Sequence, residues 1–393
     1  MPAFILLEYT SSRLGKSLFS AHISMLPFLF MGIISFIRLM QKLEFRVREQ
    51  WTGMLLFFAI PAVGTQYLLI SYDAVLLSLF LLSLVLYLEN KKVFFTIILV
   101  LIAGITGRGI FALAAIFFIC FLWHRASFRS WIPLFLPAVI FYFGWYYYHY
   151  SKTGYIFAAD NGWSSQRGLA DAGQIFKNTI SIARVLFDMG IFLLVAGNAI
   201  VIYKMKKLPV RFLVWLCPFI IFSFSFVFLT NPINHRYYLI VFVLLLLPVL
   251  KLLADKKLIY TFGLLILLIA GNFQVYPGKI SNAWDSTLSH LPYYNLRNAF
   301  ISYMDGAKLD RSKTGTVFPM NTSLQQTDLK DDTVRMINVN GGSIDSLPYV
   351  LYSNVGNDFS DEQIDQLKQW KVIKKEKSGC IEMILYQNPR DSI

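Results

Sequence analysis

Ten apolar runs in the first 275 residues constrain the fold more strongly than any other feature of the sequence. An α-helix crosses the hydrocarbon core of a bilayer with roughly 20 apolar residues. The sequence therefore predicts an all-α polytopic membrane domain over residues 1–275 with about ten spans. The runs lie near residues 17–40, 53–71, 74–89, 93–106, 109–123, 131–150, 182–203, 210–229, 237–253 and 257–275.

Composition supports a bilayer environment. Hydrophobic residues make up 56% of the chain and charged residues 15%, against roughly 25% charged residues in soluble proteins. The net charge of +13 sits in the apolar part, since residues 1–276 hold 23 Lys/Arg and 9 Asp/Glu, whereas the remainder holds 13 and 14. Basic residues that flank spans orient them in the membrane. We therefore expect a lipid-bilayer partner and no nucleic acid.

The distribution of basic residues predicts the orientation. Alternate loops between the runs hold fifteen Lys/Arg, and the loops on the opposite side hold eight. The richer side is expected to face the cytoplasm. This predicts a multi-pass protein of the plasma (inner) membrane, with both termini outside the cytoplasm. The first residues have no basic start, apolar core and cleavage site, so they do not form a signal peptide.

Residues 276–393 have a different character and predict a small extracytoplasmic α/β domain. Short β-like runs at 314–318, 333–339, 349–353 and 381–386 alternate with helical patterns at 282–305 and 361–370. About 110 residues suffice for a separate core. Of the three cysteines, Cys120 and Cys217 lie in apolar runs and Cys380 lies in this part, so no disulfide framework is expected.

Unusual polar residues gather on the predicted outer face. Ionisable groups at membrane depth are costly and usually serve a function. Arginines bind phosphate in a bidentate manner, so this set suits an anionic ligand such as a lipid phosphate. The set comprises Asp73, Arg108, Asp160, Trp163, Arg167, His235, Arg236 and Tyr237.

Simpler roles are open for the same residues. Asp73 suits the N-terminus of a helix, where a carboxylate favours the helix dipole. Arg108 suits an interfacial position with its guanidinium among headgroups, and His235-Arg236 suits an interfacial anchor. Arg184 and Asp188 stand four residues apart and are expected to pair with each other.

Motifs of soluble enzymes are absent from the sequence. It has no Walker A loop, no dinucleotide-binding glycine pattern, no H-E-x-x-H and no Cys/His metal spacing. No cofactor and no metal ligands are therefore predicted, and a divalent-metal requirement is left open.

Four segments together resemble the polyprenyl-phosphate-sugar-dependent glycosyltransferases of the GT-C fold. The segments are 61–89 with Ser71-Tyr72-Asp73-Ala74, the turn 103–108 ending in Arg108, the segment 178–190, and His235-Arg236-Tyr237. They are similar to elements of the superfamily that contains protein O-mannosyltransferases and lipid A aminoarabinose transferases. The resemblance covers roughly residues 1–275 and implies sugar transfer from a polyprenyl-phosphate donor at the outer face, to an acceptor that the sequence does not identify.

The resemblance also implies roles for individual residues. Arg108 and Arg236 would contact the lipid phosphate, with His235 and Tyr237 beside them. Asp73 would lie on the acceptor side, as would the loop residues Asp160, Trp163 and Arg167. A general base would deprotonate the acceptor hydroxyl.

One departure from the family affects that base. Residues 1–4 align best with a segment that follows the family's first outer loop, and that loop carries the expected catalytic acid. The catalytic residue is therefore unknown, with Asp73 as the fallback candidate, and we expect the chain as given to be inactive. Two other classes stay open: a non-catalytic membrane protein that binds a polyprenyl-phosphate lipid or a protein partner, and a secondary transporter. The lack of paired, broken helices in the sequence argues against the transporter.

Overall fold

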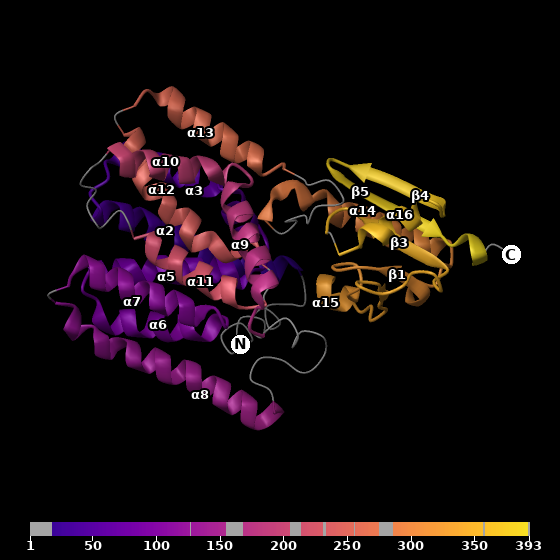
Figure 1. Cartoon of the computed structure of the whole chain (residues 1–393), viewed down its shortest axis with the longest axis horizontal. Coiled ribbons are helices and arrows are strands. Elements are labelled where there is room, and N and C mark those ends of the chain that lie inside the picture. The colour runs from indigo at the N-terminus through magenta and orange to yellow at the C-terminus, as the bar shows by residue number, and fades with distance from the viewer. Residues whose placement is uncertain are drawn as a thin grey trace. The chain divides into compact units, whose positions relative to one another are not determined.

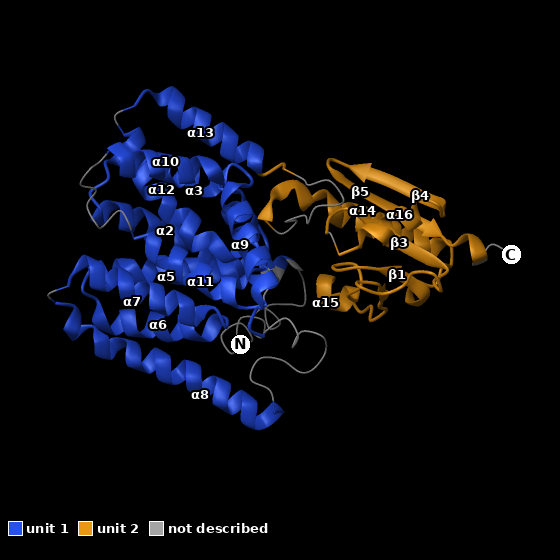
Figure 2. Cartoon of the chain, in the orientation of Figure 1, with its two compact units in different colours: residues 1–15, 19–271 blue, residues 16–18, 272–393 orange. Residues whose placement is uncertain are grey.

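The computed structural model is mostly helical, with a small sheet near the C-terminus (Figure 1). It describes residues 18–125, 127–154, 168–204, 214–230, 233–254, 256–274, 286–356 and 358–391. The chain divides into two compact units (Figure 2). Unit 1 comprises residues 1–15 and 19–271, and unit 2 comprises residues 16–18 and 272–393.

In the described residues, the regular secondary structure of unit 1 is helical, apart from an isolated antiparallel bridge between Leu169 and Leu229. One continuous apolar core joins its helices, and α12 is the most enclosed of them, since twelve of its fifteen residues are buried. The α-helices are α2 (Leu18–Lys42), α3 (Val47–Ala59), α4 (Pro61–Leu68), α5 (Tyr72–Leu88), α6 (Lys92–Ile105), α7 (Gly109–Trp123), α8 (Leu136–Thr153), α9 (Ala172–Phe187), α10 (Ile191–Lys204), α11 (Leu216–Phe228), α12 (Leu239–Leu253) and α13 (Leu258–Gly271). Short 3-10 helices η1 (Phe128–Ser130) and η2 (Ile132–Phe135) precede α8, and η5 (His235–Tyr238) precedes α12.

The number of helices that can cross a membrane is smaller than predicted. In the described residues, three helices are long and apolar enough: His22–Lys42, Phe128–Thr153 and His235–Leu253. Two bent pairs raise the number to five if each pair is one span. The expectation of ten spans was wrong because five of the apolar runs form helices of only 10–17 residues. Three of these runs, at 74–89, 93–106 and 109–123, had already been predicted at about fifteen residues, and the helices α5, α6 and α7 have nearly the same lengths.

The bent pairs have identifiable causes in the sequence. Helices α3 and α4 meet at 72°, where Pro61 begins α4 and supplies no backbone N–H to continue α3. Helices α9 and α10 meet at 87°, where Met189 and Gly190 both adopt positive φ values of 53° and 80°. The sequence analysis did not identify either break.

Both breaks lie against one residue, Gly271 at the end of α13. A Cβ atom at this position would overlap the carbonyl oxygen of Met189 and would lie 3.1 Å from Cγ of Pro61. Glycine therefore allows α13 to approach both bends closely.

Unit 2 is an α/β module with two small apolar cores. Its helices are α14 (Pro292–Gly306), α15 (Leu324–Asp328) and α16 (Asp361–Leu367), with 3-10 helices η7 (Leu288–His290), η8 (Arg311–Lys313) and η9 (Pro389–Asp391). The strands are β1 (Thr314–Thr316), β2 (Ile337–Asn338), β3 (Tyr349–Ser353), β4 (Lys371–Ser378) and β5 (Ile381–Gln387), in the order β2-β1-β3-β5-β4. Strand β1 pairs in parallel with β2 and β3, and β5 pairs antiparallel with β3 and β4.

Two elements of unit 2 were missed by the sequence analysis. Strand β4 lies at the sheet edge and contains several lysines in place of the apolar residues by which a strand is usually recognised. Lysines on an edge strand protect it from pairing with another chain. Helix α15 has only five residues, too few for a periodic pattern.

Candidate functional site

Asp73 is buried near the start of α5, and it is not the helix cap. The Ser71 side chain caps α5 by accepting a hydrogen bond from the backbone N–H of Asp73 at 3.1 Å. Asp73 lies in the first turn of α5, as expected, and the capping residue is Ser71. The Asp73 carboxylate makes side-chain contacts instead, and these build the candidate site.

Arg108 reaches Asp73 from the turn between α6 and α7. One of its Nη atoms lies 2.8 Å from Oδ1 of Asp73, and only 14% of the arginine side chain is exposed. The guanidinium lies 3.8 Å from the ring centre of Tyr237 and 5.3 Å from that of Tyr72. The Tyr142 hydroxyl donates to the carbonyl of Gly107 at 2.9 Å and fixes the turn. Arg108 is therefore directed into the protein rather than extended toward headgroups.

Arg236 approaches the other oxygen of the same carboxylate from η5. Its Nε lies 3.7 Å from Oδ2 of Asp73, and 30% of its side chain is exposed. An Nη atom also lies 3.4 Å from the Tyr237 hydroxyl. The structure thus brings together Asp73, Arg108, Arg236 and Tyr237, which are far apart in the sequence.

A second carboxylate, Asp188, lies beside this group at the end of α9. Its Oδ2 is 3.3 Å from Nε of Arg184 and 3.3 Å from Nε2 of His235. Because His235 and Arg236 are consecutive in η5, Asp188 ties the end of α9 to the arginine that faces Asp73. We call Asp73, Arg108, Asp188, Arg236 and Tyr237, with their partners Tyr72, Arg184 and His235, the anion cluster.

The sequence analysis missed two members of the cluster. It paired Asp188 only with Arg184 and placed both in one long span, whereas Asp188-Met189-Gly190 ends a helix in the way that a glycine after the last turn commonly does. It named Tyr72 only as the residue before Asp73 and gave it no role in the site. The predicted loop residues Asp160, Trp163 and Arg167 lie outside the described residues.

The geometry of the cluster suits an anion with several acceptor oxygens. Two guanidinium groups share the Asp73 carboxylate, and one Nη atom of Arg108 is buried without a hydrogen-bond partner among the described residues. A buried donor without an acceptor is costly. A phosphate oxygen would supply an acceptor, and its charge would offset the guanidinium charge.

The cluster offers little for acid–base or metal chemistry. Both carboxylates are already in contact with cations or an imidazole, so neither is left facing an open space where an acceptor hydroxyl could approach. No group of three or more His, Cys, Asp or Glu side chains that could hold a metal occurs in the part of the chain that the structure describes.

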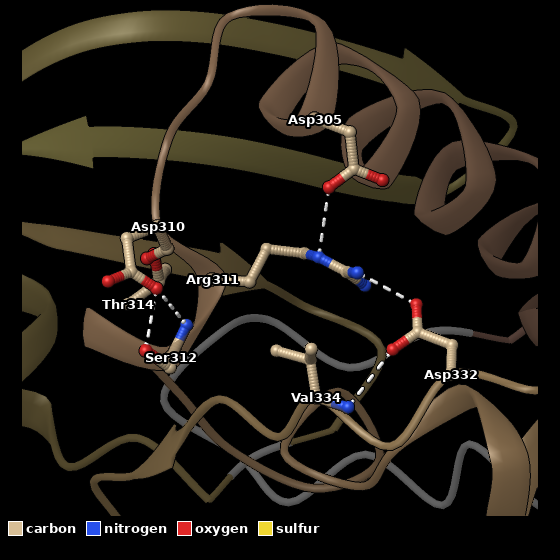
Figure 3. A network of polar contacts seen from close by, with 7 residues as sticks. All are labelled: Asp305, Asp310, Arg311, Ser312, Thr314, Asp332 and Val334. Carbon is tan, nitrogen blue, oxygen red and sulfur yellow. Dashed lines mark hydrogen bonds and ion pairs between the residues drawn. The ribbon is translucent and has the colours of Figure 1, made fainter.

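Unit 2 contains a charge network in which one arginine lies between two carboxylates (Figure 3). Nε of Arg311 lies 3.0 Å from Asp305, and an Nη atom lies 2.7 Å from Asp332, which also accepts from the backbone N–H of Val334 at 3.0 Å. Partial burial raises the pKa of Asp332, but the hydrogen bonds from Arg311 and Val334 outweigh it and leave the pKa below its usual value. This network is self-contained, and we assign it a structural role.

No protein-family model matches the chain, and neither a curated protein nor a solved structure is similar to it.

Proposed function

We propose that the anion cluster binds the phosphate of a polyprenyl-phosphate sugar donor at the outer face of the plasma membrane, in a GT-C-like membrane protein that we expect to be inactive in sugar transfer as given. The observation that carries the proposal is the convergence of Arg108 and Arg236 on opposite oxygens of Asp73, with a buried donor of Arg108 left for a ligand. The resemblance of the same residues to the family supplies the class of ligand.

Each residue of the cluster has a distinct task in this proposal. Arg236 is the more exposed arginine and meets the phosphate first. Arg108 is held between the Tyr72 and Tyr237 rings, so it offers its donors with little loss of side-chain freedom. Asp73 orients both guanidinium groups, and its negative charge offsets part of their positive charge until the ligand binds. Charge stabilisation of the leaving phosphate by these arginines is the catalytic contribution that the cluster supplies.

Binding of a polyprenyl monophosphate to the purified chain tests the proposal. We expect the double variant Arg108→Gln/Arg236→Gln to lose binding, by about 1.5–3 kcal/mol for each charged hydrogen bond removed. Polyprenol without phosphate is the ligand control. Arg38→Gln, which removes an exposed arginine of α2, is the matched control and should bind as the wild type does.

A third variant separates binding from folding. The double variant leaves the Asp73 carboxylate buried without its cations, which by itself is destabilising. Asp73→Asn/Arg108→Gln/Arg236→Gln removes all three charges together and should fold while still failing to bind. Wild-type affinity in this folded triple variant contradicts the proposal.

A second candidate function is non-catalytic binding of the same lipid. Neither Asp73 nor Asp188 is placed as a general base, because each carboxylate contacts positively charged or imidazole groups within the cluster. Incubation of the 393-residue chain in lipid with a panel of polyprenyl-phosphate sugars tests for turnover. Binding without turnover is the result that we expect of the chain as given, and it agrees with both functions. Turnover favours the enzyme, and Asp73→Asn then tests whether that carboxylate acts in it.

Labelling of single cysteines tests the outer location. A cysteine at Lys256 should be protected from a membrane-impermeant thiol reagent in intact cells, because the excess of basic residues predicts that this loop is cytoplasmic. A cysteine at Lys152, which is exposed at the end of α8, should react. The reverse pattern rules out an outer-face site.

A further inference from the structure

Helix α9 has three kinds of surface. Residues three, four and seven apart share one face of a helix. Asn178, Ile182 and Val185 form the buried face, and Lys177, Ser181 and Arg184 form a polar flank. The face opposite the buried one is apolar and exposed: Phe176 is 68%, Ile180 53% and Phe187 61% accessible. We call these last three residues the α9 stripe.

The buried face of α9 is fastened to the end of another apolar helix. The side-chain amide of Asn178 donates to the carbonyls of Phe226, Val227 and Leu229 at 2.9, 3.1 and 3.0 Å. These carbonyls lie at and just beyond the C-terminus of α11, where backbone acceptors have no partner within the helix. The middle of α9 therefore lies at the level where α11 ends.

The C-terminal end of α9 meets the beginnings of two further helices. Three residues separate α9 from α10, and the two helices meet at 87°. They run in different directions in Figure 1. Asp188, the residue that follows α9, contacts His235 at the start of η5, directly before α12. Helix α9 thus runs past the end of α11, the start of α10 and the residues before α12. These three helix ends lie at the same depth in unit 1.

We propose that α9 is an interfacial helix whose stripe binds the boundary between lipid headgroups and acyl chains. The span His235–Leu253 begins at the residue that Asp188 contacts. The beginning of a span marks the surface of the hydrocarbon core, so the end of α9 lies at that surface, and α9, which crosses α10, lies in the plane of the membrane. The bilayer accounts for exposed phenylalanine and isoleucine side chains at this level. Lys177 on the adjoining flank suits anionic headgroups. This inference concerns the depth of α9 and does not depend on what the anion cluster binds.

Nitroxide labels on the full chain test the proposal. Cys217→Ser and Cys380→Ser remove the two accessible thiols, whereas Cys120 is fully buried and is retained. Single cysteines at Phe176, Ile180 and Lys177 are then labelled, and each protein is reconstituted in bilayers of phosphatidylcholine and phosphatidylglycerol. Retained size-exclusion behaviour shows that each labelled chain is folded.

The collision rates of the labels decide the result. At 176 and 180 we expect collisions with oxygen, which concentrates in the bilayer, to exceed collisions with a water-soluble nickel complex. At 177, on the polar flank one residue away, the nickel complex should dominate. Nickel-dominated labels at 176 and 180 would overturn the proposal by placing the stripe in water. Labels at these positions shielded from both probes would also overturn it, by showing that protein covers the stripe.

Discussion

The two units hold similar charged residues in opposite proportions. In unit 1, one buried carboxylate, Asp73, lies between two guanidinium groups, those of Arg108 and Arg236. In unit 2, one guanidinium group, that of Arg311, lies between two carboxylates, those of Asp305 and Asp332 (Figure 3).

The difference distinguishes a candidate ligand-binding site from a structural charge network. Arg311 finds acceptors on two sides, and its carboxylate partners are partly exposed at 53% and 23%, so water completes their hydrogen bonding. Arg108 is more enclosed by aromatic rings and keeps a buried donor without an acceptor among the described residues. The first arrangement is complete without a ligand, whereas the second is improved by one. This comparison leads to the following predictions.

Asp73→Asn should have the largest effect. It leaves the enclosed guanidinium of Arg108 without its counter-ion, and breaking a buried pair in this way costs about 3–5 kcal/mol of unfolding free energy. Equilibrium unfolding in mixed micelles measures the loss, and a saturating polyprenyl phosphate should recover part of it. The matched control is Glu89→Gln, because Glu89 makes only an exposed ion pair with Lys42 at 4.0 Å. If Asp73→Asn leaves the free energy of unfolding unchanged, Arg108 does not need Asp73 as its counter-ion. The contrast with unit 2 is then false.

Arg311→Met should have a smaller effect, confined to unit 2. It removes charged hydrogen bonds worth about 1.5–3 kcal/mol at most, and the exposure of both carboxylates reduces the loss further. Hydrogen exchange should accelerate in the loop around Val334 and not in unit 1. Arg335→Met, at an exposed position of the same loop, serves as the control. A loss as large as that of Asp73→Asn would remove the distinction between the two networks.

Acidification should weaken the same loop. Because the pKa of Asp332 is lowered in the folded protein, its contribution to stability is fully present above the unfolded pKa of about 3.9. It is lost as the pH falls from there through the folded pKa. Amide exchange at Val334, corrected for the intrinsic pH dependence, should rise over that interval in the wild type. The variant Asp332→Asn should lack this step, and an unchanged step in the variant assigns the titration to another group.

Asp305→Asn should have the smallest effect. Asp305 is 53% exposed and Arg311 retains Asp332, so the expected cost is about 0–1 kcal/mol, as for other surface ion pairs. Thermal unfolding of the full chain should be close to that of the wild type. A clear shift would show that both carboxylates are needed to hold Arg311.

The sequence was sufficient to predict several features of unit 1. Apolar runs located its helices, and the prediction that Asp73, Arg108 and His235-Arg236-Tyr237 lie on one side grouped residues that the structure brings together. The two helix breaks were not predictable in the same way, because hydropathy does not register where backbone hydrogen bonding stops. Pro61 and Asp188-Met189-Gly190 carried the stop signals, and both lie within or beside apolar runs.

Contacts between distant segments were beyond the sequence. Nothing in the spacing of Asp188 and His235 indicates that they lie 3.3 Å apart; the 87° bend after α9 creates that contact. Strand β4 was missed for a different reason, since its lysines hide the pattern by which a strand is recognised, and only its pairing with β5 reveals it.

The close approach at Gly271 has a consequence for how this chain can vary. Every amino-acid change that a single nucleotide substitution can make in a glycine codon adds a Cβ atom, and here that atom overlaps the Met189 carbonyl and approaches Pro61. One missense change at Gly271 would therefore disturb two helix breaks at once. Exposed apolar positions such as Ile266 in the same helix accept other apolar residues without such a clash. Among the folded members of a library of single-codon variants, substitutions should thus be rare at position 271 and diverse at position 266, a few codons away.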